Sequence, residues 1–565
     1  MQARKLIRRQ IGYELPGISP LLNRLYVGRG IVDPEELDHS LANLLPPDSF
    51  KGMAKSVSVL QEAIINQQRI LIVGDFDADG ATSSALMVSC LKAMGAEHVD
   101  YLVPDRFKFG YGLTKEIVEV ALGFSPDVIV TVDNGISSVE GVDAAVSNNI
   151  KVVITDHHVS GATLPAADAI LNPNQPGCAF PSKAIAGVGV AFYLLSALRS
   201  SLREINWFTH GQPNLADFLD LVALGTIADV VPMDKNNRIL VAEGLKRIRA
   251  GRARPGIYAL ISISGADHAR VTSRDLAFGI GPRLNAAGRL ENMSLGIECL
   301  LADKDRALEL ANRLEQLNTE RKSIEADMKA QAQEDISQYQ TLGQNEFGVG
   351  VCLFHPQWHQ GVVGIVASRI KDQIHRPVIA FAKASEHELK GSARSIPGLH
   401  IRDALDTIAA KNPGLLVKFG GHAMAAGLSI EPRNFEKFRQ LFDEEAQRWL
   451  SEEDLEQVVV SDGEIDEELS LSLATMVIEA APWGQGFPEP VFDGEFEVLD
   501  QRIVASRHLK LKLRPINSTN TLEAIAFNHD RLLERRQLRL AYRLDINRYR
   551  GLESVQLIVE CVDLS

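Results

Sequence analysis

The sequence predicts an α/β protein of several domains, on three observations. Between about residues 68 and 158, short apolar runs alternate with helix-like stretches, which is the pattern of a parallel sheet covered by helices on both faces. Residues 305–336 are highly charged and contain neither proline nor glycine, which predicts one long helix. Beyond a turn-rich junction at 461–466, short alternating runs predict a small β-rich domain.

The first α/β region contains four expected strands with helices between them. The strands are short runs rich in valine and isoleucine, at 69–77, 99–103, 127–133 and 151–158. The intervening segments carry apolar residues at helical spacing, at 81–95, 113–123 and 139–149. Further helices are expected up to about residue 300, and strand character returns at 346–354.

A chain of 565 residues is too long for one hydrophobic core, so several domains are expected. We divide it into five segments. These are an N-terminal amphipathic leader (1–50), the parallel-sheet domain (51–300), the connecting helix (301–340), a second α/β domain (341–455) and the terminal β-rich domain (456–565).

Composition excludes some classes of protein. No run of eighteen apolar residues exists, so no transmembrane helix and no membrane partner are expected. The basic start lacks the apolar core of a signal peptide. Five widely spaced cysteines without a C-x-x-C pair indicate reduced thiols, so a cytoplasmic location is expected. The formal charge of −14 argues against wholesale coating of nucleic acid but allows a local basic channel.

Acidic and histidine side chains follow the ends of three predicted strands. They are Asp75, Asp77 and Asp79 after the first strand, Asp133 after the third, and Asp156, His157 and His158 after the fourth. Because ligands of open α/β sheets bind at the carboxyl edge, these side chains are expected to converge there. Crowded carboxylates with one or two imidazoles suit magnesium or manganese. Asp229 follows an apolar run, so it should be partly buried and need a partner such as a metal.

The same residues allow other interpretations. D-x-D-x-D-G also begins a calcium-binding EF-hand loop, but the twelfth position counted from Asp75 is Leu86, where a glutamate is required. The motif also follows a strand rather than a helix. A solvated acidic turn, ordinary histidines, and a simple turn at Asp133 remain alternatives for each part alone. Their joint occurrence at one sheet edge favours the metal site.

Four of these motifs together resemble the DHH phosphoesterase superfamily. They are "DFDADG" (75–80), "VDNG" (132–135), "TDHH" (155–158) and "GTIADVVP" (225–232). "GPRLNAAGRL" (281–290) and "GGHAMAAG" (420–427) are similar to motifs of the RecJ single-strand-specific DNA exonucleases. The resemblance implies a parallel-sheet DHH domain, a long connecting helix, a second α/β domain of DHHA1 type and a C-terminal β-barrel with the OB-fold.

The resemblance also implies two divalent cations, Mn²⁺ or Mg²⁺, and a set of ligands. The implied ligands are Asp77, Asp79, Asp133, His157 and Asp229, with Asp133 bridging both ions. His158 would contact the scissile phosphate, Asp75 and Asp156 would orient ligands, and Arg283 is counted with them as catalytic. Some superfamily members have a ligand histidine where this chain has Val73, so water or another carboxylate, such as Asp75, would take that position.

The substrate residues implied by the resemblance are Asn285, Arg289, His359, Ser392, Arg394, Gly420, Gly421 and His422. Glycines let backbone N–H groups approach a phosphate, and a guanidinium fork suits phosphate well. The alternatives are a tight turn that opens a packed helix at 420–427 and surface salt bridges for Arg283 and Arg289.

The expected function is hydrolysis of single-stranded DNA from the five-prime end to mononucleotides, in DNA repair and recombination. Single-stranded DNA, a single-strand-binding protein and a helicase are the expected partners. Basic side chains along 508–514 and seven arginines in 531–550 favour a polymeric substrate, although a solvated strand face is the alternative. Two other functions stay open: a phosphodiesterase or pyrophosphatase for oligonucleotides or cyclic dinucleotides, and a binding module with a degenerate site.

Overall fold

The structure is a computed structural model that describes residues 5–209, 211–341, 348–549 and 551–563. At 337–341, 549 and 563 only the backbone is described. The chain forms two compact units, which we treat separately. Of the described residues, the smaller unit comprises 5–7, 319–341, 348–460 and 561–563, and the larger comprises the rest, in 8–318 and 461–560.

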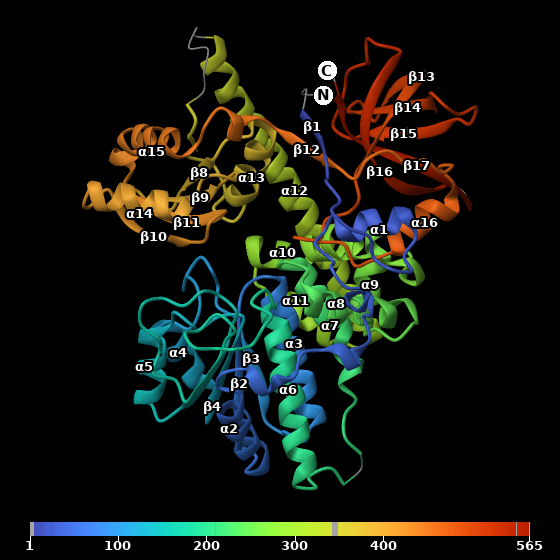
Figure 1. The fold of residues 1–565 in the computed structure, drawn as a ribbon. Coiled ribbons are helices and arrows are strands. Elements are labelled where there is room, and N and C mark those ends of the chain that lie inside the picture. The colour runs from blue at the N-terminus through green and yellow to red at the C-terminus, as the bar shows by residue number, and fades with distance from the viewer. Residues whose placement is uncertain (1–4, 210, 342–347, 550, 564–565) are drawn as a thin grey trace. The chain divides into compact units, whose positions relative to one another are not determined.

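The larger unit contains a five-stranded parallel sheet with strand order β3-β2-β4-β5-β6 (Figure 1). The strands are β2 (Ile70–Gly74), β3 (Val99–Leu102), β4 (Val128–Val132), β5 (Lys151–Thr155) and β6 (Ala169–Leu171). The first four match the predicted strands. The three residues of β6 are too few to give a periodic pattern, so the sequence did not reveal it. All residues of β2 and β4 are buried, as expected for strands covered on both faces.

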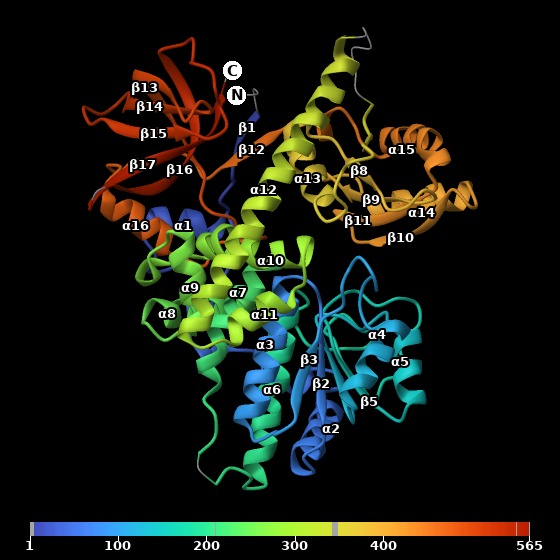
Figure 2. The same cartoon turned by 180° about the vertical axis from the view of Figure 1, so that it is seen from behind.

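Helices cover both faces of this sheet, as predicted (Figures 1 and 2). On one face, α4 (Lys115–Ala121) and α5 (Val139–Ser147) share a hydrophobic cluster with Val73 and Ile129 of the strands. The helices that contact the sheet on the other face are α2 (Met53–Ile65), α3 (Ala78–Ala93) and α6 (Gly187–Glu204).

A helical layer follows the sheet. Its members are α7 (Leu219–Ala228), α8 (Lys235–Arg249), α9 (Pro255–Ser264), a π-helix (Asp275–Ile280), α10 (Gly281–Leu290) and α11 (Ser294–Leu301). The predicted long helix is α12 (Lys304–Thr341).

The N-terminal segment is integrated in the larger unit. In α1 (Pro20–Val27), Leu25 is fully buried and the Tyr26 hydroxyl donates to the Ala480 carbonyl oxygen over 2.9 Å. Residues 20–27 therefore belong to a core, a role that an amphipathic leader alone does not imply.

The smaller unit contains a mixed five-stranded sheet of order β10-β11-β9-β8-β7. Only β7 and β8 pair in parallel, and the other neighbours are antiparallel. The strands are β7 (Val351–Phe354), β8 (Val378–Lys383), β9 (Leu389–Arg394), β10 (Leu416–Gly421) and β11 (Ala425–Ile430), with helices α13 (Val363–Ile374), α14 (Ile401–Lys411) and α15 (Phe435–Trp449). The second α/β domain is thus confirmed.

The C-terminal strands close into a barrel of order β13-β14-β15-β17-β16, as predicted. They are β13 (Phe492–Val504), β14 (His508–Pro515), β15 (Leu522–Ala526), β16 (Gln537–Tyr549) and β17 (Leu552–Asp563), and α16 (Leu471–Glu479) precedes them. Near the chain's start, β1 (Lys5–Arg8) pairs with β12 (Val458–Ser461). Over the part of the chain that is described, no helix has both the length and the apolar character that crossing a membrane requires.

Candidate metal centre at the carboxyl edge of the sheet

The candidate site lies where the order of the strands reverses. The chain runs from β2 to β3 on one side and returns to β4 on the other side of β2. Ligands of open α/β sheets bind in the crevice at such a switch point. The loop with Asp75, Asp77 and Asp79 follows β2, and Asp133 follows β4, so the two main acidic motifs flank the switch point.

Hydrogen bonds fix the first acidic motif onto the start of α3. Asp77 is the N-cap, and its carboxylate accepts from the backbone amides of Asp79 and Gly80, each at 3.0 Å. A Cβ at Gly80 would lie 2.5 Å from the Asp75 carbonyl oxygen, so this tight turn requires glycine. The motif is a strand-to-helix connection, which is not the context of an EF-hand loop.

Asp79 is held by the beginning of another helix. Its carboxylate accepts from the backbone amides of Gly187, at 2.7 Å, and Val188, at 3.0 Å, in the first turn of α6. Exposed N–H groups at a helix N-terminus favour a negative charge. Asp79 is 1% exposed, so these amides keep the orientation of a buried carboxylate fixed.

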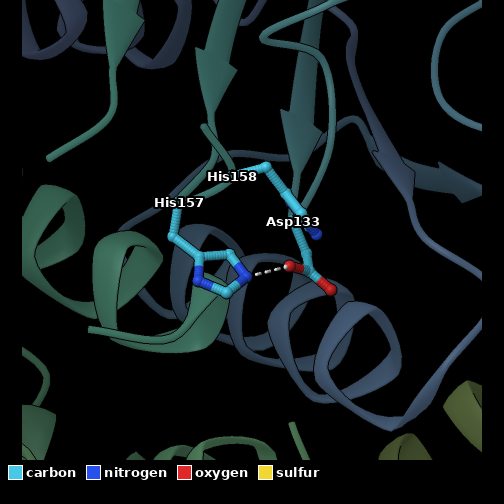
Figure 3. A group of neighbouring side chains, drawn as sticks. All are labelled: Asp133, His157 and His158. Atoms are coloured by element: carbon cyan, nitrogen blue, oxygen red, sulfur yellow. Dashed lines mark ion pairs between the residues drawn. The ribbon is translucent and has the colours of Figure 1, made fainter. Parts of the chain in front are cut away.

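Asp133 occupies a left-handed backbone conformation, with φ of 60°. Aspartate tolerates this region better than most residues. Its amide donates to the Thr155 carbonyl oxygen over 3.0 Å, and its carbonyl accepts from the Tyr111 hydroxyl over 3.2 Å. The bend carries the Asp133 carboxylate away from the strand direction, towards His157 (Figure 3).

Three buried atoms meet beside Asp133. His157 Nε2 lies 3.1 Å from Asp133 Oδ1 and 3.4 Å from Asp229 Oδ2. Apart from these ion pairs with one another, none of the three atoms has a hydrogen-bond partner among the described residues. Buried polar atoms are normally hydrogen-bonded, so three such atoms that meet without hydrogen bonds call for another group between them.

The arrangement offers three overlapping sets of ligand atoms, each within 4.8 Å. They are Asp79 with His157 and Asp229, Asp75 with Asp77 and Asp133, and Asp133 with His157 and His158. Carboxylate oxygens with one or two imidazoles are donors that suit Mg²⁺ or Mn²⁺. The residues present therefore fit divalent cations, as the sequence predicted.

Burial and mutual repulsion raise the pKa values of several acidic side chains, as expected of carboxylates that gather at a cation site. Burial, reinforced by the neighbouring carboxylates, raises the pKa of Asp75, Asp79 and Asp133 well above the ordinary value, and burial raises the pKa of Asp229. Burial also lowers the pKa of His157, which favours the neutral imidazole that a metal requires. A bound cation would offset both the burial of the carboxylate charges and the repulsion between them.

His158 is in a different state from its neighbour. Burial alone would lower its pKa, but a 2.7 Å contact between Nδ1 and Asp156 Oδ1 outweighs burial, and the pKa of His158 rises to about 9. Burial would likewise raise the pKa of Asp156, but this hydrogen bond lowers it. The Tyr111 hydroxyl contacts His158 Nδ1 at 3.2 Å. His158 is therefore a positively charged group at neutral pH beside the carboxylates.

Comparison with known proteins agrees with this geometry. The DHH family N-terminal domain matches residues 69–226, the DHHA1 domain matches 346–448, and the RecJ OB domain matches 461–561. The single-stranded-DNA-specific exonuclease RecJ of Dickeya dadantii is 54% identical over 557 residues, which are 97% of this chain and 96% of that protein. The Escherichia coli protein of the same name is 51% identical, over the same shares of the two chains.

The chain belongs to the RecJ family. Among solved structures, RecJ from Thermus thermophilus in complex with Mn²⁺ is similar, with a TM-score of 0.80, 29% identity, and coverage of 99% of this chain and 79% of that chain. The complex of that protein with Mg²⁺ gives a TM-score of 0.74 and 28% identity, and covers 99% of this chain and 78% of that chain.

Two residues of the RecJ-type motif on α10 have structural partners that the sequence did not indicate. Asn285 Oδ1 accepts from the backbone amide of Ala78 over 2.9 Å, in the middle of the first acidic motif. Arg283 is 7% exposed and forms a 2.6 Å ion pair with Glu315 of α12. Arg289 lies in the last turn of α10. The contact of Asn285 therefore positions the metal loop, whereas Arg283 is paired with α12.

The remaining predicted substrate residues lie in the smaller unit. Ser392 and Arg394 are on β9, where an Arg394 Nη1 to Ser392 Oγ hydrogen bond measures 3.1 Å. Ser392 pairs with Gly427 of β11, which in turn pairs with Gly420 of β10, so one row crosses three strands.

The other predicted residues of this unit lie in two turns. Gly421 ends β10, and the His422 amide donates to the Ala425 carbonyl oxygen over 2.8 Å in the turn that follows. His359 Nδ1 accepts from the Gly361 amide over 3.1 Å.

Two residues near the metal centre were missed at the sequence level. Arg106 lies over the Phe76 ring, with 4.4 Å from its guanidinium carbon to the ring centroid, and interacts electrostatically with Asp75 and Asp77. Tyr111 contacts Asp133 and His158, as described above. Both lie in the loop between β3 and α4. Its basic and aromatic composition, "DRFKFGYGL", is the signal that could have found them.

The arginines of the barrel are paired more than the sequence suggested. Arg539 forms ion pairs with Asp493 and Glu464, and Arg543 forms them with Glu489 and Glu560. On β14, Lys510 and Arg514 pair with Glu523 and Glu497 of neighbouring strands. These four cations therefore have carboxylate partners within the larger unit.

Proposed function

We propose that the chain is a metal-dependent exonuclease specific for single-stranded DNA. The observation that carries this proposal is the cluster of Asp133 Oδ1, His157 Nε2 and Asp229 Oδ2, which are buried without hydrogen-bond partners at the switch point of the sheet. Membership of the RecJ family supplies the substrate class. The barrel segment, matched by the RecJ OB domain, favours a polymer over cyclic dinucleotides or very short oligonucleotides.

Two cations are proposed, each held by its own set of residues. Asp79, His157 and Asp229 would hold one, and Asp75, Asp77 and Asp133 the other. The 3.1 Å separation of Asp133 from His157 supports Asp133 as the bridge between them. Asp75 belongs to the second set, so it is the carboxylate proposed to take the place of the ligand histidine that is absent at Val73.

The chain's own groups prepare the reaction in three ways. When bound, the cations supply Lewis acidity and lower the pKa of water, which makes a nucleophile available at neutral pH. The amides of Gly187 and Val188 keep Asp79 oriented. His158, kept protonated by Asp156, donates a hydrogen bond to the scissile phosphate and can pass its proton to the departing sugar oxygen.

The proposal includes polarity and product. We propose attack at the terminal phosphodiester, from the five-prime end, with release of mononucleotides. Ser392, Arg394, His359, His422 and the glycines at 420 and 421 are proposed to bind nucleotide phosphates, which the row of small residues across β9, β11 and β10 supports.

A labelled-strand assay tests the proposal. The full chain with Mn²⁺ should release a labelled mononucleotide at once from a five-prime-labelled oligonucleotide, and a shrinking ladder from a three-prime-labelled one. Asp229→Asn should abolish both, because it removes a negative charge from the proposed cation site, where Oδ2 has no hydrogen bond and only the 3.4 Å ion pair with His157. Asp143→Asn, on the exposed face of α5, is the matched control. Faster cleavage of cyclic dinucleotides than of long strands would favour the other phosphodiesterase function.

The cellular setting is also proposed. We place the chain in the cytoplasm, in DNA repair and recombination, with a helicase to supply the strand and a single-strand-binding protein to keep it open. The five-segment division, at residues 50, 300, 340 and 455, remains our proposal. It is supported by the three family matches, each of which falls within one segment. Stimulation of duplex digestion by a helicase would test the partnership.

A further inference from the structure

A cavity of about 630 Å³ lies within the larger unit, between the segment before α10 and the C-terminal barrel. Its volume is within the range of about 300–1,000 Å³ that is usual for small-molecule sites. None of the residues that line it is a candidate metal ligand. The cavity is therefore separate from the site of hydrolysis.

Both walls of the cavity are fixed by direct contacts. The Ser273 hydroxyl donates to the Trp483 carbonyl oxygen over 2.6 Å, and both residues are buried. On the other side, Arg270 forms an ion pair with Glu553 of the barrel. Direct contacts thus join the two parts of the chain that form the cavity.

Nine charged residues line this cavity, and two of them, Arg274 and Asp545, lie close enough to interact without forming an ion pair. The Arg274 side chain has no hydrogen bond or ion pair with any described residue, although it interacts electrostatically with Asp545. Burial raises the pKa of Asp545, while the Ile546 amide and then Arg274 oppose that shift. The Arg274 guanidinium and the Asp545 carboxylate thus line one cavity and lie near each other without forming an ion pair. Such a pair suits a ligand that presents both acceptors and donors.

An aromatic ring completes the lining. Phe278 is 76% exposed although it is a large apolar residue, and it lies on the π-helix that leads into α10. Short π-helical segments occur frequently at functional sites. An exposed aromatic ring at the rim of a polar cavity is the arrangement on which nucleic-acid bases stack.

We propose that this cavity binds a nucleobase, with guanine preferred, which stacks on Phe278 and is read by Arg274 and Asp545. An arginine fork matches the O6 and N7 acceptors of guanine. A carboxylate can accept from the adjacent N1–H and amino group of the same base. Thymine lacks that combination. The base can come from a released mononucleotide or from a bound single strand, and the second source rests on the proposed function.

Calorimetry on the full chain without divalent cations tests the proposal, because no hydrolysis then occurs. dGMP should bind more tightly than dTMP, and deoxyribose 5-phosphate should not bind. Phe278→Ala should weaken dGMP binding on the order of tenfold, as loss of a stacking ring does. Asp545→Asn, which keeps the side-chain shape, should remove the preference for guanine. Phe124→Ala, an exposed phenylalanine outside the cavity, is the control.

A second arm separates the two sources of the base. Oligothymidine strands that carry one guanine at successive positions are titrated in the same way. A preference confined to strands assigns the cavity to the substrate, and competition by dGMP assigns it to the product as well. Absence of any base preference, with both cavity variants behaving as the parent chain, overturns the proposal. Failure of the proposed function would instead show as absence of Mn²⁺-dependent nucleotide release by the parent chain.

Discussion

The side chain of Asn285 on α10 accepts a hydrogen bond from the backbone amide of Ala78, which lies between Asp77 and Asp79. The two residues are 207 positions apart in the chain. Ala78 is 1% exposed, so its N–H has no access to water as a substitute partner. This one contact ties the RecJ-type motif to the metal loop.

Replacing Asn285 tests whether it positions the loop. Asn285→Ala should destabilise the fold by about 1–3 kcal/mol, the usual cost of a buried donor without an acceptor. Asn285→Asp keeps an acceptor oxygen and should retain more stability. The measurement is thermal unfolding with and without Mn²⁺. A residue that only touches substrate would leave both melting curves unchanged, and that result would contradict the positioning role.

Gly288 offers a steric test of the same contact between α10 and the loop. A Cβ at this position would lie 1.8 Å from the Phe76 carbonyl oxygen, so Gly288→Ala must displace the loop. We expect a loss of about 1–3 kcal/mol in the free energy of unfolding and weaker stabilisation by Mn²⁺. Gly123→Ala is the control, because nothing lies within 4 Å of its added Cβ. Equal melting temperatures for the two variants would show that the helix and loop can separate freely.

Local pattern predicted the strands and the acidic residues at their ends. Buried parallel strands have a distinct composition, and their carboxyl ends must share an edge, so Asp77, Asp133 and His157 could be brought together from sequence alone. Partners far apart in the chain could not be predicted. Arg283 pairs with Glu315, and Arg539 pairs with Asp493. In the sequence each arginine is only a basic residue, because its carboxylate partner is distant in the chain and is brought near only by the fold.

Removing charge from the metal centre should have opposite effects with and without metal. Asp133→Asn takes one negative charge from a cluster in which burial and repulsion disfavour ionisation, so the metal-free protein should melt higher than the parent. Stabilisation by Mn²⁺ should shrink, because ligand binding to the folded state is what raises its stability. Nucleotide release should fall by more than about 100-fold, since even residues that only support a metal ligand contribute 10–100-fold.

Chelation supplies the control for that experiment. Treatment with a chelator should lower the melting temperature of the parent chain and leave that of Asp133→Asn nearly unchanged. Asp143→Asn should behave as the parent in both states, because its carboxylate is exposed on α5. If metal stabilised the Asp133 variant as strongly as the parent, Asp133 would not be a ligand.

The burial of His39 leads to a prediction about how the stability of the fold depends on pH. Burial, and then the charge of Arg238, lowers the pKa of His39 to about 4 from 6.5, and its Nε2 is buried without a described hydrogen-bond partner. A histidine whose pKa is lower in the folded state contributes stability above the unfolded value of 6.5, and this is lost as pH falls towards 4. Because the ring is partly exposed, we expect a loss of about 1–2 kcal/mol.

His39→Gln isolates this contribution, since glutamine cannot take up a proton. The difference in free energy of unfolding between parent and variant, measured at pH 7 and again near pH 5, cancels the titration of all other groups. The parent should lose more stability than the variant over this interval. A parent that loses no more than the variant would mean that His39 is protonated as readily in the folded chain as in the unfolded one, against the burial beside Arg238.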